Sequence, residues 1–300
     1  MFNSFVTLKN PLRYLLIFFL FFAVAAYIFR GRGALSDSSK TLLTVTSFVF
    51  GFYINNLISH ARNRHGKVVE SLREEGGYIK AIYFNLQASF SAEVAEGEQK
   101  IIDEYLTTSM DYRTYDYAKC SPQFEEMYKS LINLRPETKK QDATYGQIIR
   151  IISELSKNRT RVETLVKERI SMFEWLIISA LLAVVLYFVY ALNSGTLLSV
   201  ILTSLIATSI TMLLVVLYSL DSLRWKEDKW FWDPLEELFT SLDLIPYFPK
   251  TLVDLGRVKP VKGHPVRLAE CPYPYPNISD KKIILYKSWG TDSKQSLSLQ

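Results

Sequence analysis

The sequence has few of the residues from which metal sites and catalytic triads are usually built. Its 300 residues include only two cysteines, Cys120 and Cys271, and three histidines, His60, His65 and His264. Two isolated cysteines make no zinc pattern, and His60 and His65 are five positions apart, which is the wrong spacing to share a metal on one helix face. We therefore predict no metal site, no cofactor and no catalytic residues, and we do not expect an enzyme.

The sequence also lacks a strong excess of charge of one sign. It contains 35 lysines and arginines against 30 acidic residues, a net charge of +5. Residues 1–59 account for +4 of this excess, with five bases and the single acid Asp37. The remaining polar regions are nearly balanced, so the charge gives no nucleic-acid footprint, and no nucleic-acid partner is expected.

Four long apolar runs dominate the sequence, at residues 14–29, 41–59, 175–192 and 196–220. About 20 helical residues cross the hydrocarbon core of a bilayer, so these runs predict membrane spans. A cleaved signal peptide is an alternative for the first run, because residues 23–27 are mostly small. The length of this run and the flanking Arg13 and Arg30 favour a retained helix. We predict an integral protein of the inner or plasma membrane, in contact with lipids.

Basic residues near the ends of the runs predict the orientation. The side opposite to them holds only residues 30–40 and the short turn at 193–195. The basic side holds these residues: Lys9, Arg13, Arg62, Arg64, Lys67, Arg161, Lys167, Arg169, Arg224, Lys226 and Lys229. We therefore expect both termini and the long middle segment to be cytoplasmic.

The middle segment has the apolar spacing of helices and no strand alternation. Gly76 and Gly77 predict a kink or break in its first helix. Its last helix, residues 144–170, is expected to continue directly into the third run. The fold class predicted is all-α, with four transmembrane helices that continue into a cytoplasmic helical domain.

The predicted organisation has five parts. Residues 1–59 carry the first two spans, residues 60–172 form the cytoplasmic helical domain, and residues 173–223 carry the third and fourth spans. Residues 224–249 form a juxtamembrane segment with three tryptophans and an amphipathic helix. Residues 250–300 are rich in proline and then in serine, and they predict an extended arm with a disordered tail.

The second run and its continuation, TSFVFGFYINNLISHARNR (residues 46–64), have two unlike sides. At 100° per residue, the side opposite the polar stripe holds apolar residues suited to lipid or to neighbouring helices: Leu42, Leu43, Phe50, Ile54, Leu57 and Ile58. The stripe itself combines aromatic, small and polar residues: Thr44, Phe48, Gly51, Phe52, Asn55 and Ser59. An unpaired amide in hydrocarbon costs several kcal/mol, so this stripe needs a polar environment.

Two environments satisfy such a stripe. It can pack against other helices, which is the more common use of glycine, asparagine and serine in membrane helices. Alternatively, it can line a water-filled pore. Composition alone favours helix packing.

The segment SFVFGFY (residues 47–53), followed by an apolar turn and a basic exit, resembles the second transmembrane helix of the bestrophins, whose core there is close to SFVLGFY. The layout is also similar over residues 10–250, with four spans, a long helical segment after the second span and a tight turn after the third. A looser similarity at residues 230–249, WFWDPLEELFTSLDLIPYFP, resembles divergent prokaryotic-type bestrophin-like proteins. The close match covers seven residues.

The resemblance implies a homo-pentamer around a central pore for inorganic ions. The three residues that match the family's hydrophobic neck are Thr44, Phe48 and Phe52, and Thr44 departs from the usual aliphatic residue. Rings at a constriction can gate by dewetting, and their positive edges can contact a dehydrated anion. Gly51 would let neighbouring backbones approach, and further polar groups would lie just inside the neck: Asn55, Asn56 and Ser59.

A basic cytoplasmic mouth would follow the neck, formed by His60, Arg62 and Arg64. Such bases concentrate anions, although the orientation rule requires the same bases and the family includes cation-selective members. We expect chloride-like anions to be favoured over cations.

The calcium-activated bestrophins have an acid-rich clasp after the fourth span. In this sequence the matching region mixes acids with bases, and its acids are few: Asp221, Glu227, Asp228 and Asp233. Calcium prefers a cage of several oxygen ligands, so we do not carry calcium activation over to this chain.

The function expected is an oligomeric ion channel. The alternative is a non-conducting membrane scaffold or sensor that signals through its cytoplasmic helices. The hydroxyl-rich fourth run, residues 196–220, is compatible with both, because hydroxyls in a helix can bond to the preceding turn.

Overall fold

The structure is a computed structural model that describes residues 11–29, 36–112, 114–270, 281–290 and 296–299. The chain divides into two compact units. Unit 1 comprises residues 1–65 and 169–225, and unit 2 comprises residues 66–168 and 226–300. Each unit has its own buried core.

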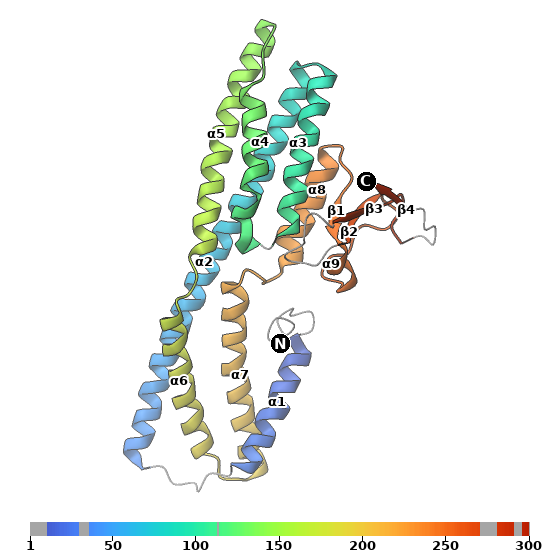
Figure 1. The fold of residues 1–300 in the computed structure, drawn as a ribbon. Coiled ribbons are helices and arrows are strands. Elements are labelled where there is room, and N and C mark those ends of the chain that lie inside the picture. Colours follow the sequence, from blue (N-terminus) through green and yellow to red (C-terminus); the bar gives the residue numbers. More distant parts are fainter. Residues whose placement is uncertain (1–10, 30–35, 113, 271–280, 291–295, 300) are drawn as a thin grey trace. The chain divides into compact units, whose positions relative to one another are not determined.

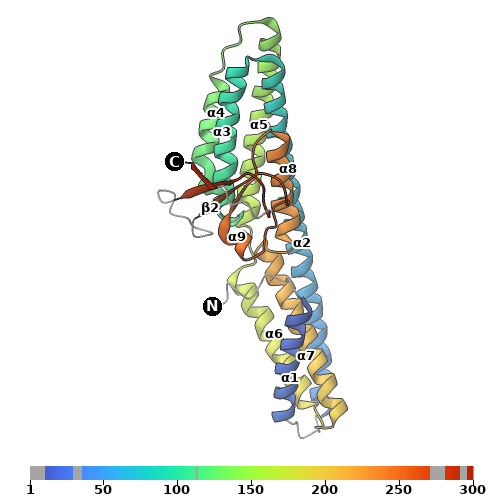
Figure 2. The ribbon, with the colours of Figure 1, turned by 90° about the vertical axis from the view of Figure 1, so that its right-hand side faces the viewer.

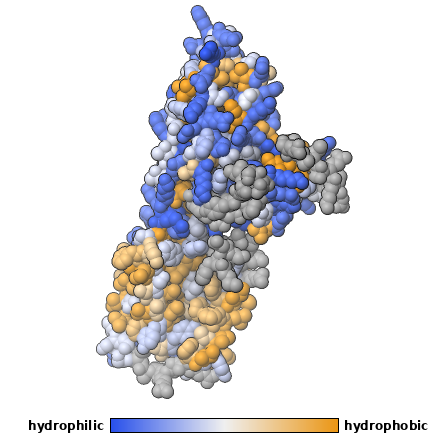
Figure 3. Space-filling view, in the orientation of Figure 1, coloured by the Kyte–Doolittle hydropathy of each residue, from blue (hydrophilic) through white to orange (hydrophobic). Residues whose placement is uncertain are grey.

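Unit 1 is entirely helical in its described part. It contains α1 (Pro11–Ile28), the first part of α2 (Asp37–Ser89), α6 (Met172–Ala191) and α7 (Leu197–Asp221), which lie side by side (Figures 1 and 2). Its core joins residues from α2, α6 and α7: Phe50, Ile54, Leu57, Ala61, Ile178, Val185, Leu217 and Leu220. The surface of unit 1 in Figure 3 is mostly hydrophobic, whereas that of unit 2 is mostly hydrophilic.

Capping residues define the ends of the helices in unit 1. Ser171 and Glu174 form a capping box at the start of α6, and Thr196 caps α7. These caps satisfy backbone N–H groups that have no partner inside the helix. Between the two helices, Gly195 has φ +79°, a conformation that favours glycine. The side-chain amide of Asn193 donates to the carbonyl of Ala26 at 2.7 Å, so the predicted tight turn is anchored to α1.

Three helical segments of the described residues are long and apolar enough to cross a membrane. One lies within α2, one contains α6, and one is α7. The predicted first span is not among them, because its described apolar helix covers Tyr14–Ile28 and is shorter than this limit. A fourth span therefore stays a prediction.

The helical part of unit 2 surrounds a second core (Figures 1 and 2). The rest of α2 packs with α3 (Ala92–Asp111), α4 (Ser121–Ile132) and α5 (Lys139–Lys167), and the short helix η2 (Thr114–Cys120) joins α3 to α4. Fully buried residues of this core recur at helical spacing: Ile79, Ile82, Leu86, Ile102, Leu106, Met127, Leu131, Ile148, Ile152 and Leu155. This pattern is the one that the sequence predicted for the middle segment.

Two helix boundaries differ from the prediction. Gly76 and Gly77 do not break α2, which is continuous from Asp37 to Ser89. A glycine costs about 1 kcal/mol in a helix interior, and the packing of flanking residues such as Ile79 outweighs that cost. In addition, α5 does not run into α6, because residues 168–171 are not helical. Ser171 caps α6 there instead.

After η3 (Asp228–Trp232), the amphipathic helix predicted in the juxtamembrane segment is present as α8 (Asp233–Ser241). The part from residue 250 onward differs from the prediction, because it is not an extended arm. Its described residues form α9 (Lys250–Asp254) and, together with a strand just before it, a four-stranded sheet. The strands, in sheet order, are β1 (Tyr247–Pro249), β2 (Val266–Glu270), β3 (Lys282–Tyr286) and β4 (Ser296–Leu299). The chain is therefore mostly helical, as predicted, but not wholly so. The proline-rich residues 271–276 and the end of the predicted tail lie outside the described residues.

The sheet pairs β1 with β2 in parallel and the other neighbours antiparallel. Polar contacts attach it to α3. The guanidinium of Arg267 binds both oxygens of Asp103 at 2.6 Å. Asp111 accepts from the hydroxyl of Tyr247 at 2.5 Å and from Lys281 at 2.6 Å.

We predict that Arg267→Met loosens the sheet. The change removes a two-pronged ion pair whose side chains are only 14% and 21% exposed, and such a pair contributes about 2 kcal/mol. Hydrogen exchange in β2 and β3 should become faster, and the thermal midpoint in detergent should fall by a few degrees. The control is Lys250→Met, which removes the more exposed pair with Glu270 and should change little. Equal effects of the two variants would contradict the assignment.

Candidate functional site

The predicted pore-lining residues lie on one exposed face of α2. Phe48 and Phe52 are 75% and 70% exposed, although they are large apolar side chains. The other predicted residues of this face are also exposed: Thr44, Gly51, Asn55, Asn56 and Ser59. We call these seven residues the α2 stripe. The structure therefore excludes a position of either ring inside its own subunit.

The opposite face of α2 explains this exposure. Phe50, Ile54 and Leu57 are at most 5% exposed and pack in the core of unit 1 with residues of α6 and α7. A helix with one face in the core must turn the residues half a turn away to the outside. The sequence assigned this face to lipid or neighbouring helices, and for these three residues the neighbours are helices of the same subunit.

The polar groups of the α2 stripe have few partners. The hydroxyl of Thr44 donates to the carbonyl of Lys40 at 3.0 Å, so its own helix satisfies it. Within the described residues, the amides of Asn55 and Asn56 make no hydrogen bond. A Cβ added at Gly51 would meet no atom within 4 Å. Nothing inside the subunit therefore requires glycine or asparagine at these positions.

The three predicted mouth residues are not brought together. His60 and Arg62 are exposed, as a mouth requires, whereas Arg64 is buried at 4% exposure. Arg64 donates to a carboxylate oxygen of Asp221 at 3.3 Å and to the backbone carbonyl of Asp221 at 2.5 Å. Arg64 is therefore an internal ion-pair residue, and its charge is committed inside unit 1.

Asp221 is the centre of a buried polar cluster that connects three parts of unit 1. Its carboxylate also accepts from Arg169 at 3.2 Å and from the backbone N–H of Ile170 at 3.0 Å. We call Asp221, Arg64, Arg169 and Ile170 the Asp221 cluster. Asp221 ends α7, where the helix dipole disfavours a negative charge, so the two arginines compensate for that position. The feature of the sequence that could have indicated this cluster is Asp221, an acid directly after a long apolar run.

Unit 2 contains a second buried cluster, which sequence reasoning missed. The hydroxyls of Tyr105 and Tyr117 donate to the two oxygens of Glu75, and Arg159 donates to the hydroxyl of Tyr105. The guanidinium of Arg159 also lies 4.5 Å from the centre of the Tyr117 ring. We call these four residues the Glu75 cluster. Its members are far apart in sequence, so no local pattern reveals it.

Burial sets the protonation of the Glu75 cluster. It raises the pKa of Glu75, an effect that Arg159 and the two tyrosine hydroxyls only partly oppose. Burial also raises the pKa of the neighbouring Cys120 thiol to about 11, so that this thiol stays protonated at neutral pH. A protonated thiol is a poor nucleophile. We therefore interpret the Glu75 cluster as a structural element of unit 2.

Two acids at or after the end of α7 are engaged in ion pairs. Asp221 belongs to the cluster above, and Glu227 pairs with Arg257. Among the described residues, no group of three or more histidine, cysteine or acidic side chains is placed to hold a metal ion. Asp221 and Glu227 therefore serve as ion-pair partners of arginines.

The comparison with protein-family models shows the family to which this chain belongs. The model of the bestrophin-like domain matches residues 13–223, which include α1 from residue 13 onward and the helices α2 to α7. The chain belongs to the bestrophin-like family. Its membership agrees with the resemblance seen in SFVFGFY and indicates a membrane protein of an ion-channel family.

Other comparisons add little to the bestrophin-like assignment. No curated protein matches the chain. A crystal structure of a membrane protein is similar at 15% identity, with 79% of this chain and 100% of that chain covered and a TM-score of 0.44. A likeness at this level does not by itself show a shared fold.

We predict that Asp221→Asn destabilises unit 1. The change leaves the guanidinium of Arg64, whose side chain is 3% exposed, without its charge partner, and breaking a buried pair costs about 3–5 kcal/mol. The thermal midpoint in detergent should fall clearly. The matched control is Asp37→Asn, which removes an exposed pair with Lys40 and should have no measurable effect. An unchanged midpoint for Asp221→Asn would contradict the role of the cluster.

We predict that Glu75 makes stability depend on pH. Because its pKa is raised on folding, the folded state keeps the proton where the unfolded state has lost it. Stability therefore falls as the pH rises from the ordinary glutamate value of 4.5 through the raised value. Glu75→Gln should lack this fall, whereas Glu74→Gln, at an exposed neighbour, should retain it. Thermal midpoints over a pH series measure the difference, and parallel curves for wild type and Glu75→Gln would refute the prediction.

Proposed function

We propose that this bestrophin-like chain forms a homo-pentameric ion channel in which α2 of every subunit lines the central axis. The observation that carries the proposal is the α2 stripe. Two phenylalanines, Gly51 and four polar residues share an exposed face, while the other face of the helix is buried. A symmetric ring of subunits supplies the missing environment, because the stripe then faces water and its own copies.

The proposed neck consists of Thr44, Phe48 and Phe52, one helical turn apart. Five copies of each ring at a constriction form a hydrophobic gate that opens when it is wetted. Thr44 carries a hydroxyl, which eases wetting at the first of the three levels. The amides of Asn55 and Asn56 follow the rings and offer dipoles to an ion that has lost part of its hydration shell.

The proposed permeant ion is a small inorganic anion such as chloride. The positive edges of phenylalanine rings contact anions favourably, and the exposed His60 and Arg62 lie beyond the neck on the side of the bases. Arg64 does not line this mouth, because its side chain is buried in an ion pair with Asp221. The basic side, with both termini and unit 2, is proposed to be cytoplasmic.

The channel proposal is tested with purified protein in planar bilayers. We expect ionic currents, and we expect Phe48→Ala combined with Phe52→Ala to raise the conductance several-fold or to change the ion selectivity, because the dewetted constriction is widened. The control is Phe21→Ala, at a ring of α1 that is 64% exposed and is expected to face lipid. A reversal potential in a salt gradient reports the preference for anions.

The same experiment separates the channel from the alternative of a membrane scaffold or sensor. A scaffold gives no current from correctly assembled protein under any salt or pH. The mass of the oligomer in native-like lipid is the first measurement, since a monomer or dimer has no central axis and would contradict the proposal.

A further inference from the structure

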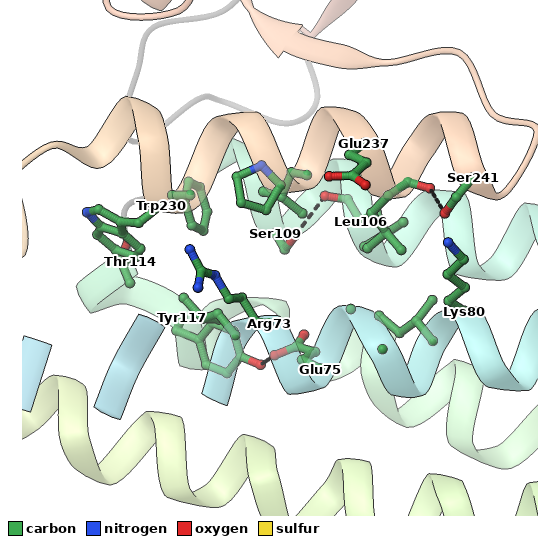
Figure 4. Close-up of a pocket in the computed structure, with 18 residues that line it drawn as sticks. Arg73, Glu75, Lys80, Leu106, Ser109, Thr114, Tyr117, Trp230, Glu237 and Ser241 are labelled. Carbon is green, nitrogen blue, oxygen red and sulfur yellow. Dashed lines mark hydrogen bonds between the residues drawn. The ribbon is translucent and has the colours of Figure 1, made fainter. Parts of the chain in front are cut away.

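A cavity of about 250 Å³ lies within unit 2, between α2 and α8. Figure 4 shows its lining side chains, with those of α2 and η2 on one side and those of α8 on the other. Its apolar walls come from Leu72, Ile79, Leu106, Phe231 and Leu238. The volume is slightly below the roughly 300–1,000 Å³ of sites for drug-sized ligands, so it suits a small molecule.

Two consecutive glycines of α2 line the same cavity. A Cβ added at Gly76 would touch only Leu238, at an ordinary 3.6 Å, and one added at Gly77 would meet no atom within 4 Å. Neither glycine has the positive φ that excludes other residues, since both lie in a regular helix. Packing inside the subunit therefore does not require glycine here, although each glycine weakens the helix. What the two glycines provide is space beside α8.

Two cationic side chains line the cavity, Arg73 and Lys80. The ammonium of Lys80 lies 5.8 Å from the centre of the Phe84 ring, and the guanidinium of Arg73 is the group that we assign to the ligand. Figure 4 shows the guanidinium of Arg73 reaching from α2 into the cavity beside Tyr117 and Trp230. Within the described part of the chain, Arg73 has no hydrogen bond or ion pair. The nearby carboxyl of Glu75 does not serve as its partner, because both of its oxygens accept from tyrosine hydroxyls.

The other polar groups narrow the choice of ligand. The hydroxyls of Ser109 and Ser241 donate to carbonyls of their own helices, Leu106 and Leu238. Glu237 of α8 lines the cavity from the side opposite to α2, and its carboxylate disfavours a ligand with more than one negative charge. The remaining recognition elements are the guanidinium of Arg73, the ammonium of Lys80, and an apolar and aromatic wall.

We propose that this cavity binds a small organic monocarboxylate with an apolar body. The carboxylate binds the guanidinium of Arg73 in the two-pronged geometry that arginine favours. The body of the ligand lies in the space beside Gly76 and contacts Phe231 and Leu238. The site is independent of the ion-conducting role, because it requires only unit 2.

Binding is measured by calorimetry on the full-length protein in detergent with two probes, 3-phenylpropionate and its neutral amide. We expect the wild type to bind the carboxylate more tightly than the amide. Arg73→Gln should weaken carboxylate binding roughly tenfold and leave amide binding unchanged, because only the charge-assisted bonds are lost. The matched control, Arg150→Gln at an exposed arginine of α5, should change neither.

A second pair of variants tests the space itself. Gly76→Leu places a side chain in the cavity and should abolish binding of both probes, whereas Gly97→Leu, at an open position of α3, should not. If Gly76→Leu lowers the thermal midpoint, Gly76→Ala is used instead. Its Cβ meets Leu238 at an ordinary 3.6 Å, so the variant should fold, and the methyl group occupies part of the space beside α8 and should weaken binding of both probes. The proposal is overturned if the wild type binds neither probe, if Arg73→Gln weakens both probes equally, or if the folded Gly76 variants bind as the wild type does.

Discussion

Inside a bilayer, polar groups need hydrogen-bond partners. This requirement constrains the molecule more than any other. Asn55 and Asn56 follow two exposed phenylalanines on α2, and their amides find no acceptor or donor among the described residues of the subunit. Hydrocarbon would leave them unsatisfied at a cost of several kcal/mol. The opposite face of α2 is fixed in the core by Phe50, Ile54 and Leu57, so the helix cannot rotate to hide the amides. No partner for these amides therefore lies among the described residues of the subunit.

The two buried clusters each provide hydrogen-bond partners for a buried acidic side chain, but they do so in different ways. In unit 1, Asp221 is surrounded by cationic and N–H donors, which bind both oxygens of its carboxylate. In unit 2, Glu75 receives neutral tyrosine hydroxyls and one more distant arginine, and burial raises its pKa. The first arrangement ties helix ends together by charge, and the second orders a helical core by hydrogen bonds.

Much of unit 1 was predictable, because a long apolar run in a sequence predicts a helix that spans the membrane. The stripe on α2 followed from helical periodicity alone, and its exposure agrees with that reading. Arg64 was assigned to an exposed mouth, since nothing local shows that Asp221, 157 residues later in the chain, is its partner. The sheet was missed for a similar reason. Its strands are only three to five residues long, and the proline-rich residues 271–276 between β2 and β3 suggested irregular structure.

At Gly76 and Gly77, local sequence predicted a feature that the structure does not have. Propensity predicted a break at Gly76 and Gly77, but neighbouring side chains such as Ile79 and Ile82 hold α2 in a continuous helix. The unfavourable residues are tolerated and leave a cavity instead.

The exposure of Phe48 and Phe52 has a consequence for how such a protein can change over generations. Side chains that are mostly exposed in their own subunit contribute little to its folding free energy. Substitutions at these two positions therefore change the surface of α2 with little effect on whether the chain folds.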